Sequence, residues 1–390
     1  MYRIKTLNKI SSIGLDRLDK NRFQVGTEVE NEDGILVRSA KMHDYEFPAE
    51  LRAIARAGAG TNNIPIDRCS ENGIVVFNTP GANANAVKEL VIAAMLVASR
   101  DIMGGAKWVQ EQAADPEVDL PAAVEKGKSA FVGPELNHKV LGVIGLGAIG
   151  AQVANAALSL GMDVYGYDPF LSVSTALRLD RHVNVVKTLD EIYKVADYIT
   201  IHVPFNPSTK DTINAEAISK MKGSVRILNL ARGGLVNNDD MIAALESGRV
   251  ARYVTDFPDG QIAKAKNVIA LPHLGASTPE SEENCAVMAV NQLEDYLVNG
   301  NIVNSVNLPS VSQDWSGISR LCLIHKNMPA MLTQIMSSLS EDGINVENMT
   351  NKSKKDYAYT MVDVNTRITD EVAAQLRAIP GVIRVRVLNH

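Results

Sequence analysis

The sequence predicts an α/β protein: a doubly wound parallel sheet, a smaller α/β unit before it and a βαββαβ domain after it. Short apolar runs between residues 34 and 78 alternate with segments that fit helices, which is the rhythm of a parallel sheet covered by helices. A longer series of apolar runs begins at Lys139, with a Gly-rich turn after its first run, as in a doubly wound sheet. Residues 318–390 follow the order strand, helix, strand, strand, helix, strand, the ferredoxin-like split motif.

Composition and charge exclude several classes of protein. The chain has 390 residues, 46% hydrophobic and 22% charged, which suits a globular protein of two or three domains. A net charge of -6 without a basic run argues against a nucleic-acid or membrane partner. The longest apolar stretch, residues 90–98, is too short to cross a bilayer. The first ten residues lack a secretory signal, and three scattered cysteines suggest neither disulfides nor a metal site. We expect a cytoplasmic protein.

Each element of the first two units follows from an apolar run and its flanks. Strands are predicted in the first unit at 35–40, 51–58 and 73–80, and in the second at 139–144, 162–169, 183–186, 197–204, 225–232, 252–257 and 267–273. Residues 89–98 predict a buried helix, whereas the polar residues 101–136 are interpreted as an irregular crossover between domains. A helix at 279–298 leads into an Asn/Ser/Pro-rich linker that ends near residue 317, where we expect a domain boundary.

The Gly-rich turn is a candidate dinucleotide site. Gly145, Gly147 and Gly150 follow an apolar strand and open a helical pattern, so the turn can bring backbone N–H groups and the helix N-terminus to a pyrophosphate. Asp168 stands at the end of the next strand, where an acid can bind both ribose hydroxyls and repel a 2′-phosphate, which favours NAD. The alternative is a structural turn whose strand-end acid caps a loop.

Three loops that follow strands of the second unit, Asn229–Gly234, Thr255–Asp259 and Pro272–Ala276, contain candidate catalytic residues. Ligands bind at the carboxyl ends of strands in an open α/β sheet. Arg232 offers a planar fork that can hold a carboxylate and polarise a neighbouring keto oxygen. His273 can exchange a proton with a carbonyl oxygen near neutral pH. An arginine or a histidine after a strand, taken alone, more often has a structural role. The position of these two beside a nucleotide-binding turn favours a catalytic role.

Together these motifs resemble those of the D-2-hydroxyacid dehydrogenases. The likeness is carried by GLGAIG with Asp168, NLARGG and PHLGAST, and it extends over nearly the whole chain. More narrowly, LVRSA, RAGAGTNN and NTPGANANAVKEL are similar to the branch of this family that oxidises 3-phospho-D-glycerate. The C-terminal segment resembles the ACT domain that several such enzymes carry.

The resemblance implies a Rossmann-like nucleotide domain inserted into a flavodoxin-like α/β substrate domain. The implied limits are residues 1–98 with 286–310 for the substrate domain, 99–285 for the NAD domain and 318–390 for the ACT domain. NAD is the implied cofactor. Besides the three glycines and Asp168, the residues expected to line its cleft are Ala148, Ile149, Val203, Leu230, Ala231, Asp256, Gly275 and Ala276.

The catalytic roles also follow from the resemblance. Arg232 would bind the substrate carboxylate and carbonyl, and His273 would be the acid/base. The family adds a glutamate that holds this histidine by its opposite charge, but the sequence departs here, because Gln261 stands where that glutamate is expected. Asp259 is the nearest acid and is assigned the orienting role. The alternative is that Asp259 is a plain turn aspartate.

A phosphorylated substrate needs local cations that the net charge does not supply. Arg38 and Arg56 each follow a strand-like run and match substrate-binding positions of the family; the alternative is that both are solvated surface residues. The neutral contacts implied by the resemblance are Ser39, Gly58, Ala59, Gly60 and Asn83.

The C-terminal segment carries a candidate effector site. His325, Asn327 and Asn345 match the serine-binding positions of feedback-inhibited dehydrogenases, and an asparagine amide can both donate to a carboxylate and accept from an ammonium group. Ala330 replaces the glycine that normally follows the proline, and its methyl group could crowd a ligand. The alternative is an ACT domain that only pairs subunits.

The expected activity is NAD-dependent oxidation of 3-phospho-D-glycerate to 3-phosphooxypyruvate, the first step of L-serine synthesis, with feedback by L-serine. The expected partners are a small phosphorylated 2-hydroxy acid and further copies of the chain, as a homodimer or homotetramer by family analogy. One alternative is a glyoxylate or hydroxypyruvate reductase of the same family. Another is a non-enzymatic NAD-sensing protein, which the missing glutamate keeps open.

Overall fold

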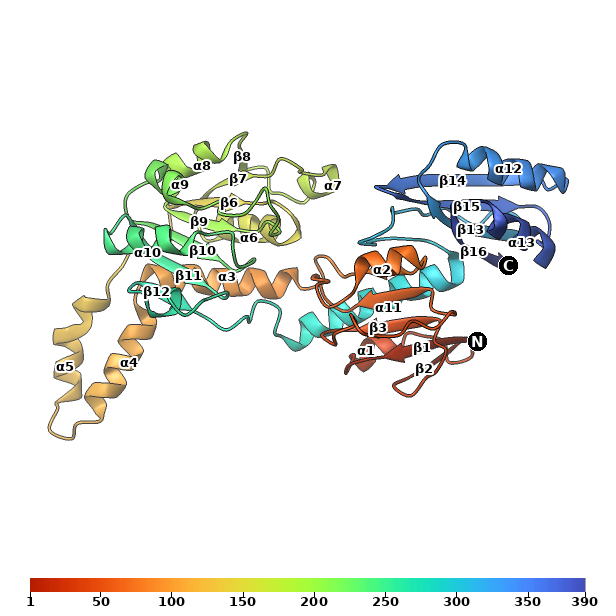
Figure 1. The fold of residues 1–390 in the computed structure, drawn as a ribbon. Helices are drawn as coiled ribbons and strands as arrows, with labels where there is room; N and C mark the ends of the chain where they lie inside the picture. The colour runs from red at the N-terminus through yellow and green to blue at the C-terminus, as the bar shows by residue number, and fades with distance from the viewer. Residues whose placement is uncertain (390) are drawn as a thin grey trace. The chain divides into compact units, whose positions relative to one another are not determined.

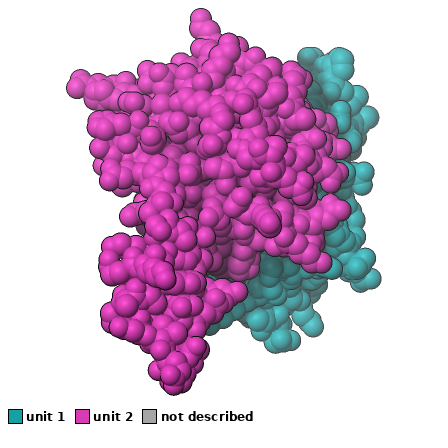
Figure 2. All heavy atoms as spheres, turned by 90° about the vertical axis from the view of Figure 1, so that its left-hand side faces the viewer, with its two compact units in different colours: residues 1–83, 279–390 teal, residues 84–278 magenta. Residues whose placement is uncertain are grey.

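The computed structural model describes residues 1–389 and divides into two compact units. One unit contains residues 1–83 and 279–390, and the other contains residues 84–278 (Figure 2). Within the described residues, no helix is long and apolar enough to cross a lipid bilayer. The domain limits expected from the sequence stay predictions.

The first unit begins with a five-stranded parallel sheet in the order β2-β1-β3-β4-β5 (Figure 1). Its elements are β1 (Tyr2–Thr6), α1 (Ser12–Leu15), β2 (Phe23–Gly26), β3 (Gly34–Val37), β4 (Ala53–Arg56), α2 (Ile66–Glu71) and β5 (Val75–Phe77). Helix α11 (Pro279–Asn299) returns to this unit and covers one face of the sheet. There Ala289, Val290 and Leu293 join Leu36 and Ala55 in a buried apolar core.

The second unit contains a seven-stranded parallel sheet in the order β12-β11-β10-β9-β6-β7-β8. Its strands are β6 (Val140–Ile144), β7 (Asp163–Tyr167), β8 (Asn184–Val185), β9 (Tyr198–Ile201), β10 (Val225–Asn229), β11 (Val250–Thr255) and β12 (Val268–Ala270). The chain runs outward from β6 to β8 and then returns to β9 on the other side of β6. This reversal is the doubly wound topology predicted, and it places the carboxyl end of β6 at the switch point.

Helices pack on both faces of this sheet in two apolar cores. They are α3 (Ala84–Ser99), α6 (Ala148–Ser159), α8 (Leu189–Val195), α9 (Ala215–Lys220), α10 (Asn238–Glu246) and the 3₁₀ turn η2 (Ile262–Lys264). The short helix α7 (Val173–Ala176) has no buried residue. Local signals start several of them. For example, Thr188 and Glu191 form a capping box at the start of α8, which satisfies N–H groups that a helix N-terminus leaves open.

The crossover expected to be irregular is helical, so that part of the sequence analysis is wrong. The segment folds into α4 (Ile102–Ala113), α5 (Leu120–Gly127) and η1 (Lys128–Phe131), which form the helical projection at the lower left of Figure 1. Asp101 caps α4 by accepting from the N–H of Gly104, and Asp119 caps α5 by accepting from Ala122. These aspartates are the helix signals that the polar composition concealed.

The C-terminal domain is a four-stranded antiparallel sheet in the order β14-β15-β13-β16. Its elements are β13 (Ser319–Lys326), α12 (Met331–Glu341), β14 (Val346–Lys354), β15 (Tyr357–Val364), α13 (Asp370–Ala378) and β16 (Val382–Asn389). Both helices pack on one face through Leu323, Ile335, Val362 and Leu376. The predicted βαββαβ order is confirmed, and with the two parallel sheets it confirms the predicted fold class.

The other face of this antiparallel sheet packs on the end of helix α11. Arg386 is buried and donates to the carbonyl oxygens of Tyr296 and Leu297, at 3.1 and 2.7 Å. Arg320 donates to the Asn299 oxygen at 2.8 Å. The last carbonyl groups of a helix have no partner within the helix, and cations at this end also oppose the helix dipole. The C-terminal domain therefore completes the hydrogen bonding of α11.

We predict that Arg386→Met lowers the free energy of unfolding by about 1.5–3 kcal/mol, because it removes buried hydrogen bonds from a charged donor. The two carbonyl oxygens keep the N–H of Gly300 and the hydroxyl of Tyr2 as donors, which limits the loss. Urea unfolding of the full chain measures the change. Arg377→Met, at an exposed position on α13, is the matched control and should change stability by about 0.5 kcal/mol or less. Equal effects of the two variants would contradict the capping role.

Candidate active site

The Gly-rich turn after β6 has the backbone that a dinucleotide turn requires. Gly145 has φ +93°, in the left-handed region that favours glycine, and its N–H donates to the Tyr167 oxygen at 2.8 Å. A Cβ on Gly150 would lie 1.9 Å from the Gly145 carbonyl oxygen, so the helix could not pack here with any larger residue. Gly147 begins α6, and a Cβ built there meets no atom within 4 Å.

Asp168 ties this turn to the end of the neighbouring strand β7. Its carboxylate accepts the N–H of Leu146 at 2.9 Å and the N–H of Phe170 at 2.8 Å. One oxygen therefore holds the Gly-rich turn and the other holds the loop after β7. The side chain is half-buried, so it stays accessible to a hydroxyl-bearing ligand.

These features fit the NAD expected from the sequence. The open space beside Gly147 lies at a helix N-terminus, where backbone N–H groups favour a pyrophosphate. The carboxylate of Asp168 lies next to that turn and suits the two ribose hydroxyls of NAD. Ala148 and Ile149 form the first turn of α6, so their N–H groups point out of the helix end.

The remaining residues expected around the cofactor follow four adjacent strands at the same edge of the sheet. Val203 follows β9, Leu230 and Ala231 follow β10, Asp256 follows β11, and Gly275 and Ala276 lie in the loop after β12. Parallel strands all end at one edge, so the topology alone gathers these residues beside the Gly-rich turn.

Arg232 is placed by a side chain that the sequence analysis did not use. Asn229 is buried, and its side-chain oxygen Oδ1 accepts the N–H groups of Ala231 and Arg232 at 3.3 and 3.4 Å. Its amide nitrogen donates to the Arg232 oxygen at 2.9 Å. An asparagine that bonds its own turn is a known stabiliser of such loops. The guanidinium of Arg232 itself is exposed.

His273 lies in the loop after β12 and is exposed. Its ring contacts the ring of Phe257, with centroids 4.5 Å apart and planes at 50°. Tilted aromatic pairs at this distance are attractive, so Phe257 restrains the orientation of the imidazole. Phe257 was not singled out from the sequence, although it directly follows Asp256 in a loop that contains candidate catalytic residues.

Asp256 is a buried carboxylate without hydrogen-bond partners. The residue is 2% exposed, and neither carboxylate oxygen has a hydrogen bond of normal geometry within residues 1–389. Burial raises the pKa of Asp256, and the charge of His273, the nearby N–H of Gly275 and the charge of Arg232 oppose that rise. Of the two acids in this loop, Asp256 is the one whose pKa depends on the charge of His273.

Asp259, the residue expected to orient His273, uses its carboxylate elsewhere. One oxygen accepts the N–H groups of Gln261 and Ile262 at 2.9 and 2.8 Å, and the other accepts from the amide of Asn238 at 2.6 Å. The bonds to Ile262 and Asn238 lower the pKa of Asp259. These contacts are those of a turn aspartate, and they give no support to the expected role beside His273.

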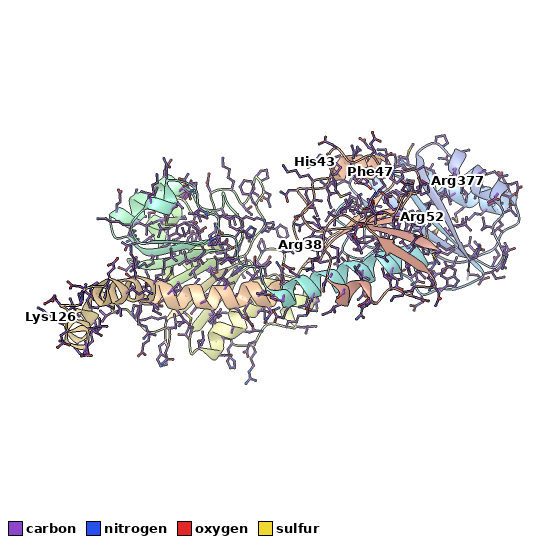
Figure 3. The ribbon with its side chains drawn as sticks, turned by 90° about the horizontal axis from the view of Figure 1, so that it is seen from below. Arg38, His43, Phe47, Arg52, Lys126 and Arg377 are labelled. Atoms are coloured by element: carbon purple, nitrogen blue, oxygen red, sulfur yellow. The ribbon has the colours of Figure 1, made fainter. Side chains whose placement is uncertain are left out.

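In the first unit, Arg38 and Ser39 directly follow β3. The side-chain oxygen Oδ1 of Asn8 accepts their two N–H groups and that of Ala40 at 2.9–3.0 Å. Asn8 was not singled out from the sequence. The guanidinium of Arg38, labelled in Figure 3, pairs with the carboxylate of Glu282 on α11, 2.5 Å away. Neither side chain is buried.

Arg56 ends β4 and lies over the next loop. Its guanidinium lies directly over Gly58, whose φ of +151° favours glycine. The amide of Asn78 donates to the Ala59 oxygen at 2.6 Å and the N–H of Thr79 donates to the Gly58 oxygen, which holds the loop. Gly60 closes it, and Asn83 lies in the turn before α3.

The three residues expected to bind an effector differ in accessibility. His325 is buried, one ring nitrogen pairs with the Lys326 oxygen and the other with the Thr360 hydroxyl, both at 2.8 Å, and burial lowers its pKa. Asn327 and Asn345 are at the surface, where their amides donate to the Lys355 oxygen and to Glu347.

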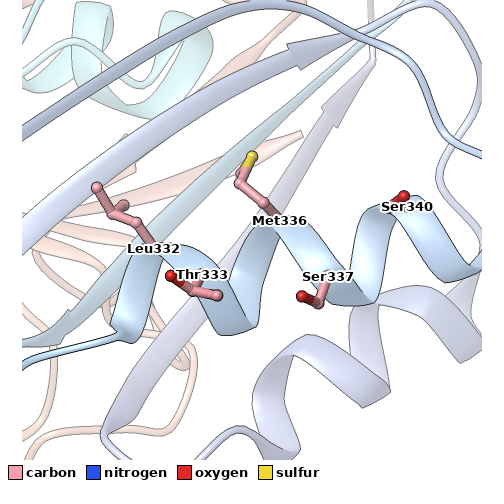
Figure 4. Close-up of a pocket in the computed structure, with 5 residues that line it drawn as sticks. All are labelled: Leu332, Thr333, Met336, Ser337 and Ser340. Atoms are coloured by element: carbon pink, nitrogen blue, oxygen red, sulfur yellow. The ribbon is translucent and has the colours of Figure 1, made fainter.

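Ala330 and the neighbouring helix complete this region. Ala330 has φ +60°, which explains why glycine is usual here. Figure 4 shows an open pocket on α12 lined by Leu332, Thr333, Met336, Ser337 and Ser340. None of the three expected effector residues lines this pocket.

Comparisons with known proteins agree with this geometry. Residues 92–275 match the family described as D-isomer specific 2-hydroxyacid dehydrogenase, NAD binding domain. The chain is 33% identical to the D-3-phosphoglycerate dehydrogenase of Escherichia coli K12 over 370 residues, which is 91% of this chain and 86% of that protein. It is also 33% identical to the D-3-phosphoglycerate dehydrogenase of Synechocystis over 80% of this chain, but it spans only 57% of that relative's length.

Solved structures share the fold. The NAD⁺-bound 3-phosphoglycerate dehydrogenase of Entamoeba histolytica has a TM-score of 0.61 at 27% identity, covering 78% of this chain and 98% of that one. A glyoxylate reductase from Paecilomyes thermophila has a TM-score of 0.60 at 24% identity, with the same coverage.

We predict that Ala330→Gly raises the free energy of unfolding by about 0.5–1 kcal/mol. It removes the strain of a left-handed alanine, about 1–2 kcal/mol, and the extra freedom of glycine in the unfolded chain offsets about 0.4–1 kcal/mol of this gain. Denaturant unfolding measures it. Ala374→Gly, within helix α13, is the control and should destabilise by about 1 kcal/mol. A loss of stability in both variants would contradict strain at Ala330.

Asp256→Asn should raise stability at neutral pH by about 1–2 kcal/mol, because it removes a buried charge without hydrogen-bond partners. Burial raises the pKa of Asp256 in the folded state above its value in the unfolded chain. Protonation therefore favours folding, and the destabilisation develops as pH rises from the unfolded pKa to the folded pKa. Unfolding measured across pH should show the variant's advantage at pH 7 and its disappearance in acid. An advantage that is independent of pH would contradict this account.

Proposed function

Because this chain belongs to the D-isomer specific 2-hydroxyacid dehydrogenase family, we propose that it oxidises 3-phospho-D-glycerate to 3-phosphooxypyruvate with NAD. One observation carries the proposal: Arg232, the buried Asp256 and His273 follow three adjacent strands at the sheet edge that carries the Gly-rich turn. The D-3-phosphoglycerate dehydrogenases, two of which are 33% identical to the chain, support the choice of substrate.

The proposed chemistry divides between the cofactor and the protein. Bound NAD⁺ would accept a hydride from the carbon that carries the hydroxyl. Arg232 binds the substrate carboxylate with its planar fork and draws electron density from the forming carbonyl. An imidazole nitrogen of His273 takes the hydroxyl proton as the carbonyl forms, and returns it in the reverse direction. Asn229 keeps the Arg232 loop in place through its three hydrogen bonds.

Asp256 acts on His273 in place of the glutamate that the family pattern expects. Its negative charge stabilises the imidazolium that forms when His273 takes the proton. The ring of Phe257 limits rotation of the imidazole. Asp259 keeps the role of a turn residue that caps η2. This arrangement needs no acid at position 261, where the sequence has glutamine.

Arg38 and Arg56 are proposed to bind the phosphate group. Arginine suits phosphate because two N–H groups can contact two oxygens at once. Arg38 starts a loop that Asn8 holds by three hydrogen bonds, and Arg56 lies over Gly58. Ser39, the backbone of residues 58–60 and Asn83 supply the neutral contacts in this proposal.

A second candidate function is the reduction of glyoxylate or hydroxypyruvate, which lack a phosphate. The observation in its favour is that Glu282 already neutralises Arg38 in the structure, which weakens attraction for a phosphate. A protein that only senses NAD is the third reading, and turnover of any 2-keto acid would exclude it.

For the C-terminal domain we propose regulation by a small amino acid, with L-serine as the first compound to test. Asn327 and Asn345 are exposed, and their amides offer both donors and acceptors. His325 is buried and would not contact the ligand directly. Its hydrogen bonds to Thr360 and to the Lys326 oxygen hold the end of β13 in place.

The test of function is NADH consumption with 3-phosphooxypyruvate, glyoxylate and hydroxypyruvate, each with and without millimolar L-serine. We expect kcat/KM for the phosphorylated acid to exceed the others at least tenfold, and serine to reduce turnover. A higher kcat/KM for glyoxylate or hydroxypyruvate would favour the second candidate. Turnover that serine leaves unchanged would remove the regulatory proposal and keep the enzyme.

The roles of the two aspartates predict opposite results for a matched pair of variants. Asp256→Asn should lower kcat by about 10²-fold, the lower end of what acid–base catalysis contributes, and should alter the pH dependence of turnover. Asp259→Asn should leave that pH dependence unchanged. If Asp259→Asn shifts the profile and Asp256→Asn does not, the assignment from the sequence is restored.

A further inference from the structure

Glu282 stands beside the cations proposed to bind phosphate. It belongs to the first turn of helix α11, and its Oε1 atom lies 2.5 Å from Nη2 of Arg38. The exposed fractions of the two side chains are 45% and 44%, so a competing anion can reach the pair without opening the core. A pair this exposed contributes little to stability, so a phosphate dianion can displace it.

The surroundings of Cys285, one turn further along α11, show that these charges act on the same small region. The thiol lies within electrostatic reach of Arg56, Arg38 and Glu282. Burial raises its pKa, both arginines oppose this rise, and Glu282 adds to it. Glu282 therefore reduces the positive potential that Arg38 and Arg56 create together.

The position of Glu282 also suits a carboxylate. The start of a helix attracts negative charge, and the guanidinium of Arg38 is in contact with it. The carboxylate thus competes with any anion for Arg38, and repels a doubly charged phosphate more than a group without charge.

From this geometry we infer that Glu282 sets the selectivity between phosphorylated and unphosphorylated 2-hydroxy acids. It occupies Arg38 in the absence of ligand, so a phosphate group must displace it or bind against its charge. An acid without a phosphate does not need Arg38 and does not meet this competition. The inference rests on the proposed function, because it takes Arg38 as part of the substrate site.

The test is Glu282→Gln, which removes the charge and keeps the shape. KM for the phosphorylated keto acid should fall about fivefold, equal to about 1 kcal/mol, with kcat unchanged. KM for glyoxylate and hydroxypyruvate should change less than twofold. Glu280→Gln, at an exposed position in the same turn of α11, is the matched control and should change neither value. An unchanged or raised KM for the phosphorylated acid in Glu282→Gln would overturn the inference.

A double-mutant cycle tests whether the effect passes through Arg38. In the Arg38→Gln background, Glu282→Gln should no longer lower KM for the phosphorylated acid. A fivefold effect that persists in that background would assign the result to general charge and overturn the inference.

Binding of inorganic phosphate, measured by calorimetry, separates this inference from the proposed function. Glu282→Gln should bind phosphate about fivefold more tightly than the unaltered chain, whether or not the chain turns over a phosphorylated acid. Tighter binding without turnover would keep the role of Glu282 and refute the proposed function. Turnover of the phosphorylated acid with phosphate affinity equal in both proteins would keep the function and refute the role of Glu282.

Discussion

Helix α11 is the element on which the first unit depends, because both of its ends are fixed by residues distant in sequence. At its C-terminal end, Arg386 and Arg320 donate to carbonyl groups of Tyr296, Leu297 and Asn299. The Tyr296 and Leu297 oxygens also accept from the N–H of Gly300 and from the hydroxyl of Tyr2. Along its length it covers the five-stranded sheet, and at its N-terminal end Glu282 pairs with Arg38. The C-terminal domain is thereby built into the unit that carries the proposed phosphate-binding residues.

In the second unit the proposed chemistry depends on Asp256, a buried residue that destabilises the folded state. A buried carboxylate without hydrogen bonds at Asp256 is unfavourable for folding, and its raised pKa expresses that cost. Such strain is concentrated at functional sites. The same burial that is unfavourable for folding makes its charge more effective on His273, because water does not screen it. The Gly-rich turn, by contrast, is held by two hydrogen bonds, from the N–H of Gly145 to the Tyr167 oxygen and from the N–H of Leu146 to Asp168.

The sequence predicts the architecture well because the signals are local. Apolar runs mark the buried strands, and the glycines at 145, 147 and 150 mark the turn. Gly145 adopts a left-handed conformation, and a Cβ on Gly150 would collide with the Gly145 oxygen. The helices at 102–127 were missed because the only sequence signals that indicate them are their capping aspartates. Asn8, Asn229 and Glu282 could not be singled out, because their roles depend on contacts made in three dimensions. Asp259 is the acid nearest to the expected position in sequence, and only the burial of Asp256 in the folded chain favours the other acid.

The central proposal is that residues of both units bind the substrate, one set at its carboxylate end and the other at its phosphate end. A crystal structure of the chain with NAD and 3-phospho-D-glycerate measures this directly. The account predicts the carboxylate on Arg232, the hydroxyl within hydrogen-bond distance of His273, and the phosphate on Arg38 with Glu282 displaced. A phosphate that contacts neither Arg38 nor Arg56, with the Arg38–Glu282 pair intact, would contradict it.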